Sequence, residues 1–401
     1  MHPRFDLSRP ETLLLPDVVE EQLHGHMTVE LFRKILIWAK GIEVSDVSFQ
    51  VDFPIKIKKN NMVFNISRCA LQPSALIRMV GIIYGAADGD DSAYQRVMAG
   101  KDNQSTYTFT QGAPGQEKES FRFRTSVLRD GADDVSIIMR LNRDEILTLD
   151  KIGQSPQGPI YQNMFPLKGL NFITGSVDSG KTTLLYACMV EFILHSKRGA
   201  FINTFENPIE GDLRRVAREN KIHNKVVSQC PVPIGVSSYL EAIDVSLRRN
   251  TDIIVLGEIR TQEEVMGAIK GVLSTGKLII GTLHTQNIPV SFSRLINTLQ
   301  SSNEGQMRAL VYDLISSMNM IVSQTLLLTV DLKRVAVNEV LIFTKEVKAR
   351  LLDVPMEKLS AEITAIMKES NNTMVDMARK YFEAGVISSE IFEQFMQDFS
   401  Y

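Results

Sequence analysis

The chain has 401 residues with 44% hydrophobic content, enough for two or three domains with buried cores, and a formal net charge of −3. This charge argues against a globally basic nucleic-acid-binding protein, and the wide spacing of the three cysteines excludes a disulfide framework and a zinc pattern. The charged start lacks the apolar region of a signal peptide, and no run of about 18 apolar residues predicts a transmembrane helix. We therefore expect a protein of the reducing cytoplasm.

Residues 1–26 contain prolines and charges of both signs, and we interpret them as a mobile arm available to a partner. His24 and His26 lie close together in this arm, but no third ligand is near, so a metal site is not expected. Apolar residues at helical spacing then predict a helix over 27–42 that stops at Gly41.

Residues 27–146 are predicted to form one smaller α+β domain. After the first helix, alternating apolar residues around a polar turn at Asn60-Asn61 predict a hairpin. A second helix is expected in SALIRMVGIIYG, and further strands are expected in STYTFTQ, ESFRFRTSVLRD and DVSIIMRL. Elements in this order are typical of an α+β fold.

The rest of the chain is predicted to contain a linker, an α/β domain and a helical tail. Glycines and prolines indicate the linker at 147–166. From 167 to 345 strands alternate with helices, which predicts a parallel sheet covered by helices on both faces. Residues 346–401 are predicted to be helical.

A glycine-framed octet, GSVDSGKT, follows a predicted strand and opens a predicted helix at 181–195. It matches G-x-x-x-x-G-K-[ST], whose glycines let successive backbone N–H groups turn inward around an anion. The helix N-terminus adds positive charge, the lysine reaches the β- and γ-phosphates, and the threonine hydroxyl binds Mg²⁺. The candidate nucleotide-binding residues are Gly175, Ser176, Val177, Asp178, Ser179, Gly180, Lys181, Thr182 and Thr183.

Acidic residues follow two of the predicted strands. Glu258 ends TDIIVLGE at the carboxyl end of a buried parallel strand, where ligands bind in α/β sheets. It is a candidate to hold a Mg²⁺-bound water or to polarise the attacking water. Glu206 ends AFINTFE at the same edge and is a second candidate for orienting that water, whereas Glu210 is a candidate cap of the next helix. Asp178, inside the octet, adds negative charge near phosphates, so its side chain is expected to point outward.

With these motifs the chain resembles the type II/type IV secretion traffic ATPases. The resemblance rests on the octet at 175–182, an acidic box at 206–210, GEIR at 257–260 and a histidine box ending in GTLHT at 281–285. The continuous block 246–298 is its most specific part. The compact length and the helical tail are most similar to the DotB-like branch, which includes TraJ-type conjugative transfer ATPases.

The resemblance implies a ring-shaped homohexamer whose subunits pair a PAS-like N-terminal domain with a RecA-like P-loop ATPase domain. It implies ATP and Mg²⁺ as ligands, with Mg²⁺ held by Thr182 and by Glu258, either directly or through water. The implied catalytic residues are Glu206, Glu258, His284, Arg124 and Arg140, with Arg122 as a further phosphate-binding residue.

The arginines come from predicted strands of the N-terminal domain. A planar, permanently charged guanidinium suits phosphate oxygens, and the alternative for each arginine is a solvated strand residue. His284 would sense the γ-phosphate or couple neighbouring elements, and Gln324 resembles a nearby family glutamine.

The chain departs from the family pattern at three positions. Asn207 stands where the family has an aspartate, which removes one carboxylate, and Lys277 replaces the first histidine of the histidine box. Thr261 replaces an acid, and with Glu264 it is predicted to form a capping box. These departures leave the hydrolytic core in place.

We therefore predict a cytoplasmic, hexameric ATPase at the inner membrane that powers type IV secretion or conjugative transfer through membrane partner proteins. A pilus assembly or retraction motor would use the same chemistry. An ATP-gated docking platform with little turnover is a further hypothesis, motivated by Asn207 and Lys277. Direct nucleic-acid binding is not expected, because the chain is acidic and lacks an aromatic and basic strand platform.

Overall fold

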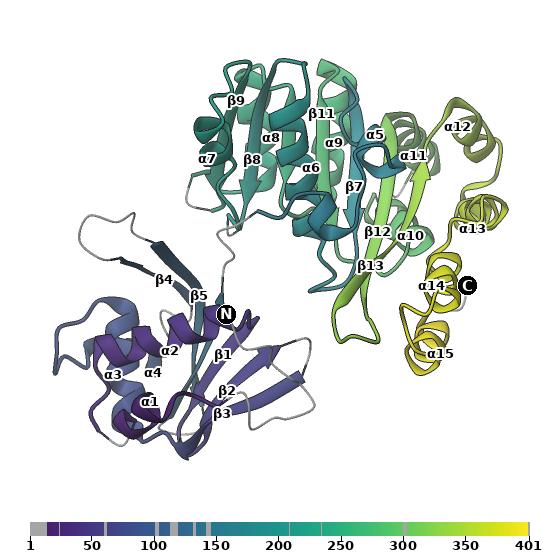
Figure 1. Ribbon diagram of the computed structural model, residues 1–401. Coiled ribbons are helices and arrows are strands. Elements are labelled where there is room, and N and C mark those ends of the chain that lie inside the picture. The colour runs from purple at the N-terminus through teal and green to yellow at the C-terminus, as the bar shows by residue number, and fades with distance from the viewer. Residues whose placement is uncertain are drawn as a thin grey trace. The chain divides into compact units, whose positions relative to one another are not determined.

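The chain divides into two compact units, Met1–Asp144 and Glu145–Tyr401 (Figure 1). The structure is a computed structural model that describes residues 14–23, 25–59, 62–100, 104–112, 119–130, 134–141, 146–207, 209–233, 235–299 and 303–399. His24 and the turn at Asn60-Asn61 lie outside the described residues. Within those ranges, no helix combines the length and the apolar character needed to cross a membrane.

Among the described residues, the first unit forms a six-stranded antiparallel sheet in the order β3-β2-β1-β6-β5-β4. Its strands are β1 (Asp46–Gln50), β2 (Pro54–Lys59), β3 (Met62–Ala70), β4 (Gln104–Gln111), β5 (Glu119–Asp130) and β6 (Asp134–Leu141). Its helices are α1 (Asp17–Gln22), α2 (Val29–Gly41), α3 (Pro73–Tyr84) and α4 (Ser92–Met98). The predicted α+β fold is confirmed for this unit (Figure 1).

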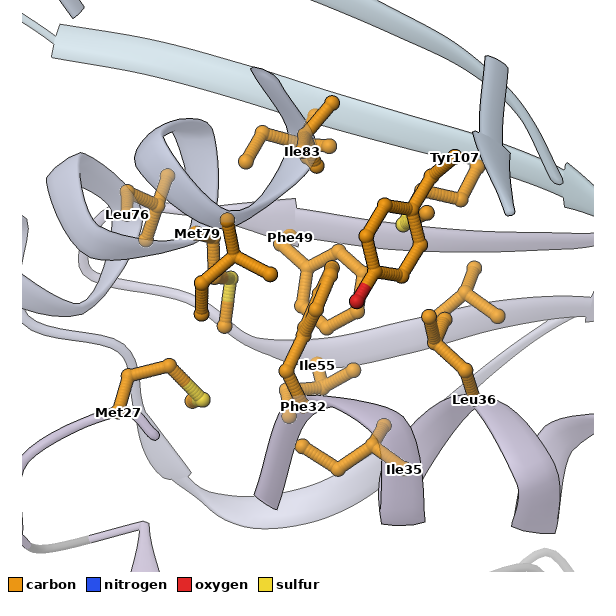
Figure 2. Packing of buried hydrophobic residues seen from close by; sticks show 14 of the residues in the cluster. Met27, Phe32, Ile35, Leu36, Phe49, Ile55, Leu76, Met79, Ile83 and Tyr107 are labelled. Carbon is orange, nitrogen blue, oxygen red and sulfur yellow. The ribbon is translucent and has the colours of Figure 1, made fainter. Parts of the chain in front are cut away.

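Helix α2 buries one face against the sheet of the first unit (Figure 2). Phe32, Ile35 and Leu36 recur at helical spacing and are fully buried. The Phe32 ring lies 5.6 Å, centroid to centroid, from the rings of both Phe49 and Tyr107. These tilted aromatic contacts join the helix to strands β1 and β4, and they fix the helix on one face of the sheet.

The segment before α2 packs on the first unit. Leu15 and Leu23 are buried, and the buried Glu20 of α1 accepts hydrogen bonds through Oε1 from the backbone N–H groups of Arg68 (2.6 Å) and Cys69 (3.0 Å). The expectation of a mobile arm is therefore wrong for residues 14–23. Apolar side chains and one buried carboxylate hold this segment against β3, which the mixed composition alone does not indicate.

The second unit is built on a sheet with the strand order β13-β12-β7-β11-β10-β8-β9, parallel throughout except for the pair β12–β13. Its strands are β7 (Gly169–Thr174), β8 (Ala200–Glu206), β9 (Lys225–Pro231), β10 (Ile253–Leu256), β11 (Leu278–Leu283), β12 (Met318–Leu328) and β13 (Arg334–Ile342). The helices around the sheet are α5 (Pro159–Met164), α6 (Lys181–His195), α7 (Leu213–Glu219), α8 (Tyr239–Arg248), α9 (Gln262–Thr275), α10 (Ile288–Thr298) and α11 (Glu304–Ser317).

The predicted helical tail carries α12 (Lys345–Leu352), α13 (Leu359–Glu369), α14 (Met374–Glu383) and α15 (Ser389–Asp398). Short 3-10 turns stand at Asp150–Ile152 and Met356–Lys358. Helix α14 lies beside β13, and α15 folds back along α14 (Figure 1). The tail is therefore helical, as expected, and its last helix pair is docked on the edge strand of the sheet.

Successive residues of the buried strands face opposite helix layers. In β10, Ile254 and Leu256 join an apolar cluster with α8, α9 and α10, whereas Ile253 and Val255 join a separate cluster with α5, α6 and α7. A strand that is buried on both faces reads as a continuous apolar run, as this one does. The predicted parallel sheet with helices on both faces is confirmed (Figure 1).

Two regions of the second unit differ from the sequence-based expectation. The edge strand β9 and the antiparallel pair β12–β13 are absent from the predicted element order. Residues 147–166, expected to form a linker, contribute Leu149, Ile160 and Met164 to the core beside α6. The Asn171 side chain of β7 donates to the carbonyl of Met164 at 2.8 Å, so α5 is part of the second unit and not a spacer.

Candidate active site

The loop between β7 and α6 leaves no room for side chains at its two framing glycines. Gly175 has φ 153° and Gly180 has φ 81°. A Cβ on Gly175 would lie 2.3 Å from the carbonyl oxygen of Gln324, and one on Gly180 would lie 2.7 Å from Gln324 Nε2. That same amide donates to the carbonyl oxygen of Ser179 at 2.7 Å. Strand β12 therefore braces the loop through Gln324, one of the residues singled out in the sequence.

Lys181, the first residue of α6, turns its ammonium back onto the loop. Nζ donates to the carbonyl oxygens of Gly175 and Ser176, both at 2.7 Å, and lies 3.5 Å from Nδ1 of His284. Burial lowers the pKa of Lys181 to about 8, against the opposing pull of nearby carboxylates, Glu258 first. The lysine thus has its donors directed at the glycine loop and at the end of β11.

His284 joins the lysine to the carboxylate that follows β10. Its Nε2 lies 3.5 Å from Oε1 of Glu258, whose other oxygen accepts a hydrogen bond from Nη2 of Arg260. Burial and the neighbouring Lys181 ammonium lower the pKa of His284, which favours the neutral imidazole. The tautomer that suits both contacts carries its proton on Nε2 and accepts through Nδ1. Lys181, His284 and Glu258 are therefore brought together as one chain of contacts.

Glu206, at the carboxyl end of β8, is held by a set of hydrogen bonds of its own. The Tyr186 hydroxyl donates to Oε2, the Thr204 hydroxyl donates to Oε1 at 2.5 Å, and Gln229 Nε2 approaches Oε1 at 3.4 Å. Glu206 is only 5% exposed, and burial raises the pKa of its carboxyl. Gly257 N donates to the Phe205 carbonyl oxygen at 2.7 Å, so Glu206 lies at the same sheet edge as Glu258.

The loop fits a phosphate group and gives Mg²⁺ few protein ligands. Ser179 Oγ is buried and has no hydrogen-bond partner among the described residues, so a hydroxyl is available inside the loop. Thr182 is half-buried in the first turn of α6 and Thr183 is exposed. In the part of the chain that the structure describes, no group of three or more His, Cys, Asp or Glu side chains gathers for a metal ion. The two candidate ligands are the Thr182 hydroxyl and the Glu258 carboxylate. Such a small set suits Mg²⁺, which usually keeps waters and substrate phosphates as its other ligands.

Val177 and Asp178 occupy the exposed tip of the loop. Val177 is 68% exposed, and Asp178 is exposed with φ 62°, the left-handed region that favours glycine. The expectation that Asp178 points outward agrees with this exposure. Its carboxylate still acts on Lys181, since it is among the charges that oppose the lowering of the lysine pKa.

The candidate arginines lie in the first unit, on neighbouring strands of its own sheet. Arg124 of β5 stands directly opposite Arg140 of β6, and Arg140 stands opposite Asp46 of β1. Arg140 Nε donates to Asp46 Oδ1 at 2.8 Å, whereas the side chains of Arg122 and Arg124 are exposed. Arg140 therefore has a structural partner in the Asp46 carboxylate, and Arg124 lies opposite this ion pair on the neighbouring strand.

Two of the three residues that depart from the family pattern, Thr261 and Lys277, have identifiable contacts, whereas Asn207 is exposed. Thr261 and Glu264 form the predicted capping box at the start of α9. Lys277 Nζ lies 3.4 Å from Oδ1 of Asp252, an ion pair at the amino end of the strands and away from the glycine loop. The expectation that Glu210 caps α7 is wrong, because Asp212 is the capping residue and accepts from Arg215 N at 2.9 Å.

A glycine loop between a parallel strand and a helix, with a lysine, a histidine and a carboxylate gathered at the carboxyl edge of the sheet, defines a RecA-like P-loop protein. Residues 116–351 match the family model described as Type II/IV secretion system protein. This match covers more than half of the chain, so the chain belongs to the type II/IV secretion system protein family, a family of ATPases.

Relatives and solved structures agree with that assignment. The Type IV pilus retractation ATPase PilT of Pseudomonas aeruginosa is 28% identical over 273 residues, which cover 67% of this chain and 74% of that protein. The Legionella pneumophila ATPase DotB superposes with a TM-score of 0.82 at 26% identity and covers 93% of this chain and 97% of its own. The pilus retraction motor PilT with bound ADP has the same fold, with a TM-score of 0.68 at 22% identity over 90% of this chain and 95% of its own.

Proposed function

We propose that the chain is an ATP-hydrolysing motor that assembles as a homohexamer and powers a type IV secretion or conjugative transfer system at the cytoplasmic face of the inner membrane. The observation that carries the ATPase part is the contact chain from Lys181 through His284 to Glu258, beside a loop without room for side chains at its glycines. The likeness to the Legionella ATPase DotB over nearly the whole chain supports a secretion system as the machine that is driven.

In this proposal the loop binds the phosphates of ATP through its backbone N–H groups and the N-terminus of α6. Lys181 would exchange the carbonyl oxygens of Gly175 and Ser176 for the β- and γ-phosphate oxygens, which are stronger acceptors for an ammonium. Thr182 and Glu258 would hold Mg²⁺, which when bound neutralises charge on the phosphate oxygens.

Hydrolysis requires a carboxylate that orients water and cations that neutralise the charge that develops on the γ-phosphate. Glu206 is the first candidate for the water, because its raised pKa makes the carboxylate a better proton acceptor. Glu258 is the second candidate, and it would need to loosen its contact with Arg260. His284 would offer the γ-phosphate its Nε2–H, while Arg122, Arg124 and Arg140 are the proposed arginines for the developing charge.

Two other functions have some support. The 28% identity to the Pseudomonas pilus protein PilT supports a pilus motor with the same chemistry and a different membrane partner. A docking platform with little turnover is supported by the internal contacts of both acids, since Glu206 is hydrogen-bonded on each oxygen and Glu258 contacts Arg260 and His284.

The proposed biological role is tested in the bacterium that carries this gene. A deletion strain would be complemented with the wild-type chain or with Lys181→Ala at equal protein levels, and both conjugative plasmid transfer and surface motility would be measured. We expect the wild type alone to restore transfer, with motility unaffected by the deletion. Restored motility without any change in transfer would favour the pilus motor.

A further inference from the structure

The carboxylate of Glu339 is buried at a junction between distant parts of the second unit. Glu339 lies on β13 opposite Ser323 of β12, and its side chain is 0% exposed. A carboxylate taken out of water destabilises a fold unless its oxygens are satisfied by strong donors. The hydrogen-bond donors to this carboxylate therefore have to stay in place for the fold to remain stable.

Glu339 accepts a hydrogen bond from the first residue of each of two helices. Ile288 N, at the start of α10, donates to Oε1, and Met374 N, at the start of α14, donates to Oε2 at 3.0 Å. Both helices have ten or more residues and point their positive ends at the carboxylate. One side chain thus connects two helix N-termini that are 86 residues apart in the sequence, 374 minus 288.

Helix α10 begins directly after residues 284–287, which we call the His284 loop. Residues 284–287 connect β11 to α10, and Arg294 of α10 donates to the carbonyl oxygen of His284 at 2.8 Å. Ser323, opposite Glu339, donates to the carbonyl oxygen of Gln286 at 3.0 Å. The position of α10 therefore sets the position of the His284 backbone.

The other helix belongs to the terminal pair α14–α15. Thr373 caps α14 in a reciprocal capping box with Asp376, and Tyr381 donates from its hydroxyl to the carbonyl oxygen of Ala336 on β13 at 3.2 Å. The two helices pack through the parallel rings of Phe382 and Phe392, 4.9 Å apart. The pair contacts the rest of the second unit mainly through β13 and lies at the margin of that unit (Figure 1).

We propose that Glu339 is a positioning residue that couples the terminal helix pair α14–α15 to the His284 loop. A shift of α14 withdraws one of the two helix N-termini from the carboxylate, and the change in that charged hydrogen bond is passed to Ile288 and the loop before it. Helix α13 also packs on α10 through apolar contacts, and these would remain when the Glu339 bonds change. The coupling itself is independent of ATP chemistry, whereas its effect on turnover rests on the proposed function.

The test uses hydrogen exchange of the full chain without nucleotide. Thr373→Ala removes the cap of α14, and Ser388→Ala removes the matched cap of α15, which does not touch Glu339. We expect Thr373→Ala, and not Ser388→Ala, to speed exchange in peptides covering 284–292 by at least about threefold, because opening at the helix start becomes easier. Unchanged exchange in Thr373→Ala, or an equal effect of Ser388→Ala, would overturn the proposal.

A second comparison assigns the effect to the carboxylate. Glu339→Gln cannot accept from both N–H groups, so adding Thr373→Ala in that background should no longer change exchange at 284–292. An undiminished effect in that background would overturn the role of Glu339. If Glu339→Gln folds poorly, the comparison of Thr373→Ala with Ser388→Ala still shows whether α14 is coupled to residues 284–292. If the wild type hydrolyses ATP, Thr373→Ala should lower kcat several-fold and leave KM unchanged. If the wild type does not hydrolyse ATP, the hydrogen-exchange comparison still tests the coupling.

Discussion

His284 Nδ1 lies 3.5 Å from Lys181 Nζ, although 103 residues separate the two in the chain. The histidine follows β11 and the lysine opens the helix after β7, and these two strands are parallel neighbours in register from Leu278 to Leu283. The parallel pairing therefore brings both strand ends to one edge, where burial depresses the pKa of each side chain. Nucleotide binding at this edge should depend on pH through Lys181.

We predict that affinity for a non-hydrolysable ATP analogue falls as the pH rises above about 8. With its pKa lowered to about 8, Lys181 is a charged ammonium below that pH and loses its charge above it. The dissociation constant should increase between pH 8 and pH 9, by at most about tenfold per unit for a single proton. Calorimetric titrations at pH 7, 8 and 9 measure this. Lys181→Arg is the control, and its dissociation constant should not change with pH, because a guanidinium stays charged. A dissociation constant of the wild type that does not change between pH 7 and pH 9 would contradict the prediction.

Glu206→Gln should keep ATP binding and lose hydrolysis, by at least about a hundredfold in kcat, if this carboxylate orients the water. An amide retains one acceptor oxygen, and the hydroxyls of Tyr186 and Thr204 can turn to accept or donate, so the fold should survive. Turnover and equilibrium binding measured on the same preparation test this. Full turnover would transfer the role to Glu258.

Tyr186→Phe is a companion to that variant. It removes one donor from Glu206 and leaves a buried carboxylate with one hydrogen bond fewer, which costs about 1–3 kcal/mol of unfolding free energy. We expect a lower thermal midpoint and reduced kcat with little change in KM. Equal activity in Tyr186→Phe and the wild type would mean that the hydroxyl only supports the fold.

Asp178→Asn should bind ATP more tightly than the wild type. The substitution removes a negative charge from the phosphate loop and keeps a residue that tolerates the left-handed backbone at φ 62°. Coulomb's law at a solvent-exposed site gives about 1 kcal/mol, so affinity should rise about three- to tenfold. Asp178→Gly removes both the charge and the backbone strain at this position. The difference in affinity between Asp178→Gly and Asp178→Asn therefore measures the effect of the strain. Weaker binding in both variants would mean that the carboxylate itself assists binding.

Arg124→Gln and Arg140→Gln should differ in stability and agree in activity. Arg124 is exposed and lies opposite Arg140 on the neighbouring strand, so its loss should leave the unfolding free energy nearly unchanged. Loss of Arg140 leaves Asp46 without its ion-pair partner, at a cost of about 1–3 kcal/mol. If both arginines act on the phosphates, each variant should lower kcat about a hundredfold or more. Normal turnover in Arg124→Gln would return that residue to the class of solvated strand arginines.

Local patterns predict most elements of the second unit because its strands are continuous apolar runs and its helices begin at recognisable signals. They place Lys181 and Glu258 at one edge, since parallel strands end together, whereas His284 is indicated by the family resemblance. They do not reveal β9, an edge strand with polar residues, or the pair β12–β13, whose apolar run resembles a buried helix segment. Nor do they reveal the roles of Tyr186 and Gln229, because a side chain that contacts a site from another element has no local signature.

The most direct test of the central claim is Mg²⁺-dependent ATP turnover per subunit across a range of protein concentrations, with Lys181→Ala as control. The account predicts turnover that rises steeply as rings assemble and disappears in the control, which should remain folded because Lys181 contacts the loop and not the core. Tight ATP binding with negligible turnover at every concentration would contradict a motor. It would favour a nucleotide-gated docking platform, and it would make the internal contacts of Glu206 and Glu258 the reason for inactivity.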